Sequence, residues 1–276
     1  MKYILLIILI FIVAIPSAES TVINDIKIIR RDVFDSELTS HNYFFYKWGN
    51  AVHIRTRDWV IRNELLYETG DELDTLKLLE TERNLRSLEF IGNARTELNY
   101  NDDSSGVDII LTTDDQWSTI LGVTSEASGG DYTYGGVLEE VNLFGWGKNL
   151  QMEYYTGSEL RGHYLYYNDY NLFKSRFRAN LLWENDGYVR STNYNINKPL
   201  YSLTDKYSYG ISGFDSRGRT RYYYSGFELF RYDSEKRSYS AYFTRSFGRN
   251  FKKNFTVSAL WSEEKYSADP GFGDYN

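Results

Sequence analysis

The chain has 276 residues, enough for one large domain or two ordinary ones. Beyond the N-terminus it holds no apolar run of about 18 residues, which excludes a bundle of membrane-spanning helices. The formal net charge of −7 argues against a nucleic-acid partner, and the lack of cysteine excludes disulfides and thiolate chemistry. The 26 tyrosines instead favour strands with one wet and one apolar side.

Residues 1–20 predict a cleaved export signal. Lys2 is followed by an apolar stretch from Tyr3 to Ile15, and the Ala18-Glu19-Ser20 segment has the small-x-small pattern of a signal peptidase site. The alternative is an uncleaved membrane anchor, but the stretch is short for spanning and no basic residue follows it as a stop. We expect the mature protein to begin near residue 21.

Residues 21–117 predict a small α+β domain that opens with a strand, because Ile26 and Ile28 alternate with polar residues. Residues 36–48 have no clear period and predict a loop or a strand extension. Thr56 is the expected N-cap of a first helix over residues 57–66, and Gly70 is expected to end it.

A second helix over residues 75–88 is expected to begin at Asp74 as its N-cap. Its apolar stripe is expected to comprise Leu78, Leu85 and Leu88. The residues expected to face water are Glu80, Glu82, Arg83 and Arg86. Two strands over residues 90–100 and 107–117 follow, joined at the turn-forming segment NDDSSG. The expected order is therefore strand, helix, helix, strand, strand.

Residues 118–276 alternate between apolar and polar side chains in stretches of roughly ten residues, the length of a tilted membrane-spanning strand. The apolar positions of four such stretches are Leu150, Met152 and Tyr154; Phe177, Ala179, Leu181 and Trp183; Tyr239, Ala241 and Phe243; and Phe255, Val257, Ala259 and Trp261. Aromatic residues near the strand ends suit interface girdles: Trp146, Trp183, Tyr188 and Trp261. A soluble β-sandwich would show the same alternation. The export signal and the strand length favour an antiparallel transmembrane β-barrel.

The segments VIRNELLYETGDELD and LLETERNLRSLEFIG resemble the POTRA module of the outer-membrane assembly family that contains BamA and TamA. The segment YTYGGVLEEVNLFGWGKNLQMEYYTGS resembles the first barrel strands of that family. The resemblance implies a barrel of about sixteen strands, whereas about ten can be counted here. The family's Val-Arg-Gly-aromatic motif is also missing from the sequence. A C-terminally truncated member is therefore expected, with a genuine ten-stranded barrel as the alternative.

The resemblance implies two candidate functional segments. An exposed edge of the α+β domain would accept an extended client strand through main-chain bonds. The first barrel strand would form a seam that opens to the bilayer, and Gly122 would weaken its cohesion. The candidate docking edge comprises Phe90, Ile91, Gly92, Asn93, Ala94, Arg95, Thr96, Glu97 and Leu98. The candidate gate strand comprises Trp117, Ser118, Thr119, Ile120, Leu121, Gly122, Val123, Thr124 and Ser125.

No catalytic, metal or cofactor motif is evident, and we expect neither enzymatic activity nor a cofactor. His41, His53 and His163 lack metal-ligand spacing. GWGKN is not a phosphate loop, and the acid pairs 114–115 and 139–140 are expected to be solvated charges.

The expected role is insertion or translocation of proteins at the bacterial outer membrane, with residues 21–117 in the periplasm and no bond chemistry. The expected partners are unfolded outer-membrane or secreted client proteins, the lipid bilayer and accessory lipoproteins, with no nucleic acid. Such a protein is also expected to be a surface antigen. The alternatives are a two-partner-type secretion pore and an outer-membrane barrel enzyme.

Overall fold

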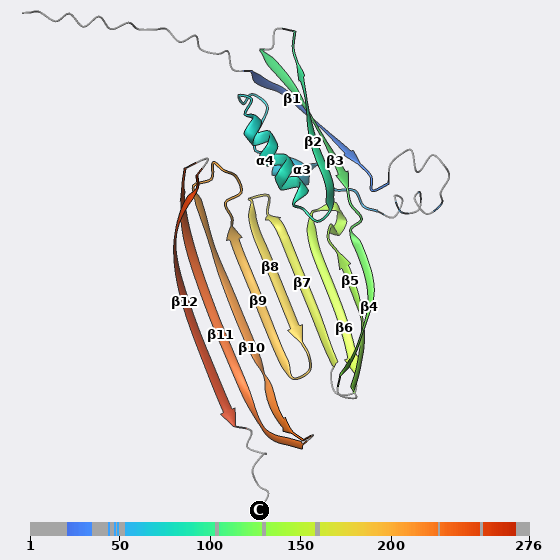
Figure 1. The fold of residues 1–276 in the computed structure, drawn as a ribbon, viewed down its shortest axis with the longest axis vertical. Coiled ribbons are helices and arrows are strands. Elements are labelled where there is room, and N and C mark those ends of the chain that lie inside the picture. Colours follow the sequence, from blue (N-terminus) through green and yellow to red (C-terminus); the bar gives the residue numbers. More distant parts are fainter. Residues whose placement is uncertain are drawn as a thin grey trace, which may run out of the picture.

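The computed structural model describes residues 21–34, 44, 47, 49, 53–102, 105–128, 131–157, 161–225, 227–248 and 251–268. The expected export signal and most of residues 36–48, including His41, lie outside the described residues. The chain forms a small α+β module followed by a large antiparallel sheet, and the module sits at one end of that sheet (Figure 1).

The module has the predicted element order. Its elements are β1 (Val22–Arg31), α3 (Asp58–Glu64), α4 (Thr75–Arg86), β2 (Ile91–Tyr100) and β3 (Gly106–Asp115). The sheet order is β1-β3-β2, with β1 parallel and β2 antiparallel to the central β3. The core between the helices and the sheet includes Ile23, Ile61, Leu85, Phe90, Val107, Ile109 and Leu111, each at most 1% exposed.

The helix boundaries confirm the predicted cap of α4 and correct both predicted ends of α3, which ends at Glu64 with Leu65 as its C-cap and not at Gly70. Asp74 caps α4, since its carboxylate accepts a hydrogen bond from the backbone N–H of Leu76 at 3.0 Å. The prediction that Thr56 caps the first helix is wrong: α3 follows Arg57, which makes no side-chain cap bond. Thr56 is fully buried and bonds elsewhere, as described below.

The stripe on α4 is confirmed, because Leu78, Leu85 and Leu88 are each at most 5% exposed. The expectation that Glu80 faces water is wrong. Glu80 is only 6% exposed, because residues 199–206, which connect two strands of the large sheet, cover it. The helical period identifies which face is apolar, but it cannot show that a segment more than a hundred residues away covers part of the polar face.

The large sheet contains nine strands in the described residues, close to the ten that the sequence predicts. They are β4 (Thr119–Ser128), β5 (Asp131–Glu140), β6 (Lys148–Gly157), β7 (Arg161–Leu172), β8 (Phe177–Asn185), β9 (Val189–Lys198), β10 (Tyr207–Tyr224), β11 (Phe227–Phe247) and β12 (Lys253–Ala268). Each strand pairs with its neighbour in sequence, so β4 and β12 are the two ends of the sheet as described. A short 3-10 turn, η1 (Leu143–Gly145), joins β5 to β6.

The strand register brings the predicted apolar positions to one face of the sheet, here called the apolar face. Directly paired residues share a face, and the pairs connect Leu138 to Met152, Leu165, Trp183 and onward across the sheet. All four apolar sets predicted from the sequence lie on this face. Large side chains on it remain exposed, including Val123 at 92% and Phe255 at 66%.

The opposite face, here called the polar face, carries mostly polar side chains. They include Gln151, Glu153, Asn168, Arg178, Asn180, Glu184, Asn193, Asn195, Ser212, Ser240 and Thr256. Tyrosines such as Tyr164 and Tyr166 and a few apolar residues, including Leu182 and Leu260, also lie there. The two faces therefore differ in chemistry along the whole width of the sheet.

The apolar band runs obliquely across the strands. One row of paired residues begins apolar and ends charged: Leu121, Leu138, Met152, Leu165, Trp183, Thr192, Asp215, Arg237 and Glu263. A second row, four residues nearer the module, begins charged and ends apolar: Lys148, Asp169, Ala179, Ile196, Ile211, Ala241 and Ala259.

The slope of the band can be estimated from standard strand dimensions. Between β5, where the apolar segment covers residues 132–138, and β12, where it covers residues 255–261, its middle shifts by about eight residues. That shift is roughly 27 Å along the strands over roughly 34 Å across seven strand spacings. The strands are therefore tilted by about 40° from the normal to the band, within the 35–45° range of membrane barrels.

Candidate functional site

The predicted gate strand is the end of the large sheet. Residues 119–125 lie on β4, which pairs only with β5 among the described residues, while Trp117 and Ser118 precede it. Leu121 and Val123 are 77% and 92% exposed on the apolar face. Gly122 lies on the polar face, where a Cβ atom would come within 2.8 Å of Val137 Cγ1, so the glycine allows close packing against β5.

The predicted docking edge lies on β2, an edge strand of the module, with Phe90 just before it. Part of this edge is already bonded to α4. Glu82 Oε1 accepts a hydrogen bond from Thr96 N, and Arg86 Nη1 donates one to Ala94 O, both at 2.7 Å. The side chain of Asn93 accepts from Ala94 N. The part of β2 beyond Thr96 remains the accessible section of this edge.

A buried polar cluster joins the module to the turn between β5 and β6. Asp115, at the end of β3, accepts a hydrogen bond from Thr56 N at 2.6 Å and lies 3.2 Å from His53 Nε2. Thr56 Oγ1 accepts a hydrogen bond from Asn142 Nδ2 at 2.9 Å, and Asn142 Oδ1 accepts one from Gly147 N at 2.8 Å. The bond between Asn142 and Thr56 ties the turn to the module, the bond to Gly147 holds the turn in shape, and Asp115 and His53 hold Thr56 from the module side.

The glycines of the same turn allow a close approach to the module. Gly145 has φ +74°, and a Cβ there would lie 2.4 Å from Arg55 O. Gly147 has φ +64°, and a Cβ there would lie 2.9 Å from Phe90 Cζ in the module core. Only glycine combines this backbone conformation with this contact. The GWGKN segment, residues 145–149, is thus part of the junction between module and sheet.

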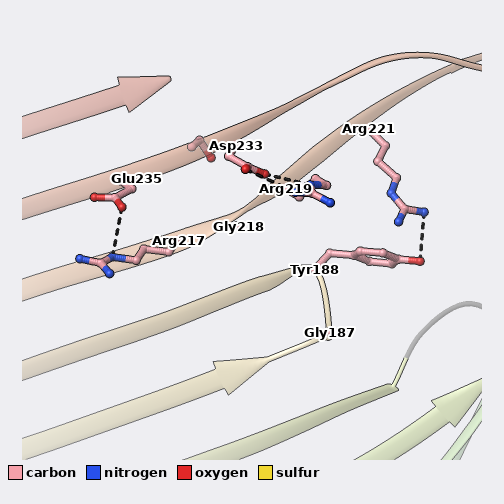
Figure 2. A pocket seen from close by; sticks show the side chains of 9 residues that line it. Gly187, Tyr188, Arg217, Gly218, Arg219, Arg221, Asp233 and Glu235 are labelled. Atoms are coloured by element: carbon pink, nitrogen blue, oxygen red, sulfur yellow. Dashed lines mark hydrogen bonds and ion pairs between the residues drawn. The ribbon is translucent and has the colours of Figure 1, made fainter. Parts of the chain in front are cut away.

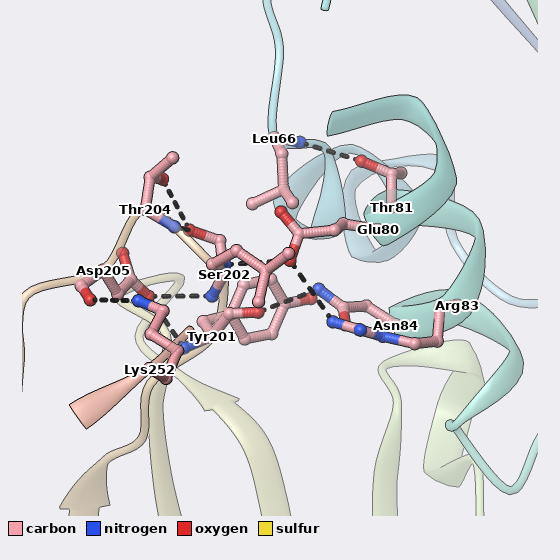
Figure 3. Close-up of polar contacts among 11 residues, drawn as sticks. Leu66, Glu80, Thr81, Arg83, Asn84, Tyr201, Ser202, Thr204, Asp205 and Lys252 are labelled. Carbon is pink, nitrogen blue, oxygen red and sulfur yellow. Dashed lines mark hydrogen bonds and ion pairs between the residues drawn. The ribbon is translucent and has the colours of Figure 1, made fainter. Parts of the chain in front are cut away.

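The segment between β9 and β10 makes a second junction (Figure 3). Glu80 Oε1 accepts a hydrogen bond from Leu203 N at 2.8 Å, and Asn84 Nδ2 donates one to Tyr201 O at 3.2 Å. Asp205 holds the segment in shape, because its carboxylate accepts from the backbone N–H groups of residues 201 and 202.

A third junction joins the C-terminus of α3 to the turn between β7 and β8. Arg176 Nη2 donates a hydrogen bond to Leu65 O at 2.7 Å, and Asn171 Nδ2 donates one to Glu64 Oε1 at 3.5 Å. Burial raises the pKa of Glu64 to about 7, against the smaller opposing effects of Asn171, Arg176 and Arg178. This carboxyl therefore titrates near neutral pH at the boundary between module and sheet.

Three turns at one end of the large sheet thus hold the module, and sequence reasoning did not identify them. The expectation that Asp115 is a solvated charge is wrong, because it is 4% exposed and hydrogen-bonded within the junction. An asparagine and two glycines within residues 142–147 were the available signal. Their partners in the module, Arg55, Thr56 and Phe90, are too distant in sequence to be recognised from spacing.

The described residues contain no group of three or more His, Cys, Asp or Glu side chains that could hold a metal ion. His53 belongs to the junction, and His163 stacks beside Trp183 on the apolar face. In the part of the chain that the structure describes, no helix has the length and apolar character needed to cross a membrane.

No protein-family model matches the sequence, and no curated protein matches it. BamA from Haemophilus ducreyi lacking POTRA domains 1–3 aligns with a TM-score of 0.43 and 13% identity, over 86% of this chain and 48% of that chain. CdiB from Acinetobacter baumannii aligns with a TM-score of 0.46 and 11% identity, over 89% of this chain and 46% of that chain.

In fold, this chain resembles BamA and CdiB. It spans about half the length of either structure. At these identities the likeness concerns the fold only, and the function proposed below rests on the residues of this chain.

Proposed function

We propose that this chain is part of a bacterial outer-membrane β-barrel that inserts or translocates other proteins. The observation that carries the proposal is the oblique apolar band. Lipid requires an apolar outer face, and strands in membrane barrels are tilted by 35–45°. A band that changes from apolar to charged along single paired rows is accounted for by tilted strands crossing a bilayer.

The height of the band supports the same proposal. On β8 and β12 it covers about seven residues, which at a tilt of about 40° corresponds to roughly 20 Å across the membrane. Outer-membrane barrels have an apolar band of roughly 25 Å. The soluble alternative, a β-sandwich, would need a second sheet to cover the exposed apolar face.

The α+β module supports a role in handling protein clients. It is POTRA-like in element order, and the three junctions hold it against one end of the sheet, which we assign to the periplasmic side. Edge strands can accept an extended chain through main-chain bonds. On this view a client approaches the section of β2 beyond Thr96 and then pairs with β4.

The role of β4 as the pairing strand follows from its position and exposure. Its outer edge has no paired strand among the described residues, and Leu121 and Val123 project from it on the lipid side. A client strand that adds to β4 would satisfy its backbone groups while its own apolar side chains enter the bilayer. This process needs no catalytic residue and no cofactor.

The test uses the whole chain, reconstituted in lipid vesicles together with an unfolded outer-membrane polypeptide. A photo-crosslinking residue at Val123 is expected to capture the client during its insertion. The matched control is the same residue at Leu181, which faces lipid on the interior strand β8 and is expected to give no client crosslink. Equal crosslinking at both positions, with the chain folded in the membrane, would contradict the role of β4.

A secretion pore is the second candidate, and the polar face favours it. Small polar side chains such as Ser208, Ser212 and Ser240 would line a wet channel. If the chain moves a client through that channel, a photo-crosslinking residue at Ser212 should capture the client and one at Val123 should not. Insertion predicts the reverse pattern.

A further inference from the structure

A cluster of arginines lies beyond the apolar band on the same face of the sheet, toward the end of β10 that Figure 1 shows farther from the module. Figure 2 shows the three arginines of β10. The apolar segment of β10 ends near Gly213, and three alternate residues after Asp215 are arginines. The arginine cluster comprises Arg190 on β9, Arg217, Arg219 and Arg221 on β10, and Arg231 on β11.

The cross-strand register places like charges opposite each other within the arginine cluster. Arg217 pairs with Arg190, and Arg221 pairs with Arg231. Like charges directly opposite destabilise a sheet, so this arrangement is unfavourable unless an anion lies between them.

Carboxylates only partly balance the cluster. Arg219 Nε lies 2.9 Å from Asp233 Oδ1, which is a well-formed ion pair. Arg217 Nε lies 3.6 Å from Glu235, and Glu228 lies 3.9 Å from both Arg221 and Arg231. Each guanidinium carries five N–H donors. At these longer distances the donors of Arg217 and Arg221 retain capacity for the oxygens of an external anion.

A recess of about 510 Å³ lies at the centre of the cluster, lined by Tyr188, Arg217, Arg219 and Arg221 together with Asp233 and Glu235 (Figure 2). The guanidinium of Arg221 lies 4.3 Å from the centre of the Tyr188 ring, and its Nη1 donates a hydrogen bond to Tyr188 Oη at 3.3 Å. The recess therefore combines phosphate-binding donors with an aromatic ring of the kind that packs against apolar faces of ligands.

The height of the cluster above the band indicates the size of its ligand. Arg217 and Arg221 follow the end of the band by four and eight residues, or roughly 10 and 20 Å along the membrane normal at a tilt of about 40°. A phospholipid headgroup layer adds only about 5–8 Å on each side of the hydrocarbon core. An anionic headgroup that reaches Arg221 must therefore be taller than that of a phospholipid.

We propose that the arginine cluster binds the phosphorylated saccharide headgroup of a glycolipid in the outer leaflet. The guanidinium groups of Arg217 and Arg221 bind its phosphates, and the ring of Tyr188 lies against a sugar. The inference rests on the proposed outer-membrane location, with the module on the periplasmic side. Such binding relieves the repulsion between the paired arginines and fixes the orientation of β9–β11 in the membrane.

The test compares the wild-type chain with the double variant R217Q/R221Q in phosphatidylcholine vesicles, with and without purified lipopolysaccharide. The matched control is K236Q, which removes a cation from the polar face of β11 at a similar height, where Lys236 lies 3.8 Å from Glu264. The readouts are the apparent affinity for lipopolysaccharide and the midpoint of unfolding. Dephosphorylated lipopolysaccharide, phosphatidylglycerol and free inorganic phosphate serve as alternative ligands.

Lipopolysaccharide is expected to raise the unfolding midpoint of the wild type and of K236Q. R217Q/R221Q is expected to bind it about tenfold or more weakly, because it loses charge-assisted hydrogen bonds. In phosphatidylcholine alone the double variant should have nearly the same unfolding midpoint as the wild type, because relief of the two arginine pairs offsets the loss of the partly exposed contacts with Glu235, Glu228 and Tyr188. Dephosphorylated lipopolysaccharide, phosphatidylglycerol and inorganic phosphate should give little effect.

Equal effects of lipopolysaccharide on the wild type and on R217Q/R221Q would overturn the inference. A response to phosphatidylglycerol or free phosphate as large as the response to lipopolysaccharide would overturn the assignment to a glycolipid. If the chain inserts in vesicles but ignores lipopolysaccharide, only this inference fails. Failure to insert in any vesicle would instead contradict the proposed function.

Discussion

The oblique band can be tested by introducing single arginines along one row of paired residues. Met152, Trp183 and Thr192 lie on the same row and the same face of the sheet. Met152 is in the middle of the apolar segment of β6, whereas Thr192 on β9 pairs with Asp215, where the band has reached its charged border. If the strands are tilted, these two positions lie at different depths in the bilayer.

The expected cost follows from that depth. Arginine on the lipid face of a barrel costs about 2–4 kcal/mol at the midplane and about 0–1 kcal/mol near the interface. Met152→Arg is therefore expected to destabilise the chain by about 2–4 kcal/mol and Thr192→Arg by at most about 1 kcal/mol. Gln151→Arg is the control: it faces the polar side one residue away and should change stability by less than about 1 kcal/mol.

The assay is reversible unfolding by guanidinium chloride in lipid vesicles, followed by tryptophan fluorescence, with free energies taken from the linear extrapolation. An equal cost for Met152→Arg and Thr192→Arg would refute the tilt, because it would place both residues at one depth. An equal cost for Met152→Arg and Gln151→Arg would refute the assignment of the two faces.

Three further predictions concern the module. Burial raises the folded-state pKa of Glu64 from 4.5 to about 7, so the folded state holds this proton more tightly than the unfolded state does. The resulting stabilisation is present at low pH and is lost as the pH rises through about 7. The free energy of unfolding should therefore fall by on the order of 3 kcal/mol between pH 5 and 8 in thermal unfolding, and Glu64→Gln should abolish this fall. Gly147→Ala should cost at least about 2 kcal/mol in urea unfolding, because of its positive φ and the contact with Phe90, and a cost below about 0.5 kcal/mol would contradict that account. Glu82→Ala removes the side-chain oxygen that accepts the hydrogen bond from Thr96 N. Hydrogen exchange of the Thr96 amide should therefore become faster, and client crosslinking to β2 should increase. Unchanged amide exchange would mean that α4 does not protect this edge.

Local patterns in the sequence were sufficient for the elements and for the chemistry of the sheet faces. The order of helices and strands in the module follows from period and turn residues, and Asp74 is the predicted cap. The apolar sets on β6, β8, β11 and β12 were also predicted, because alternation within a strand is set by backbone geometry and needs no knowledge of neighbours. The choice of β4 and β2 as end strands relied on family resemblance.

The tertiary structure alone decided which residues join the module to the sheet. Thr56 has the sequence context of a helix cap, yet it is buried and bonds to Asn142 of the turn between β5 and β6. Asp115 has the context of a solvated acid, yet it is buried and accepts a hydrogen bond from the backbone of Thr56. The slope of the apolar band is likewise a property of the register, since it appears only when nine strands are aligned. Both features depend on contacts between residues distant in sequence. Period and propensity describe only near neighbours, so they leave such contacts undetermined.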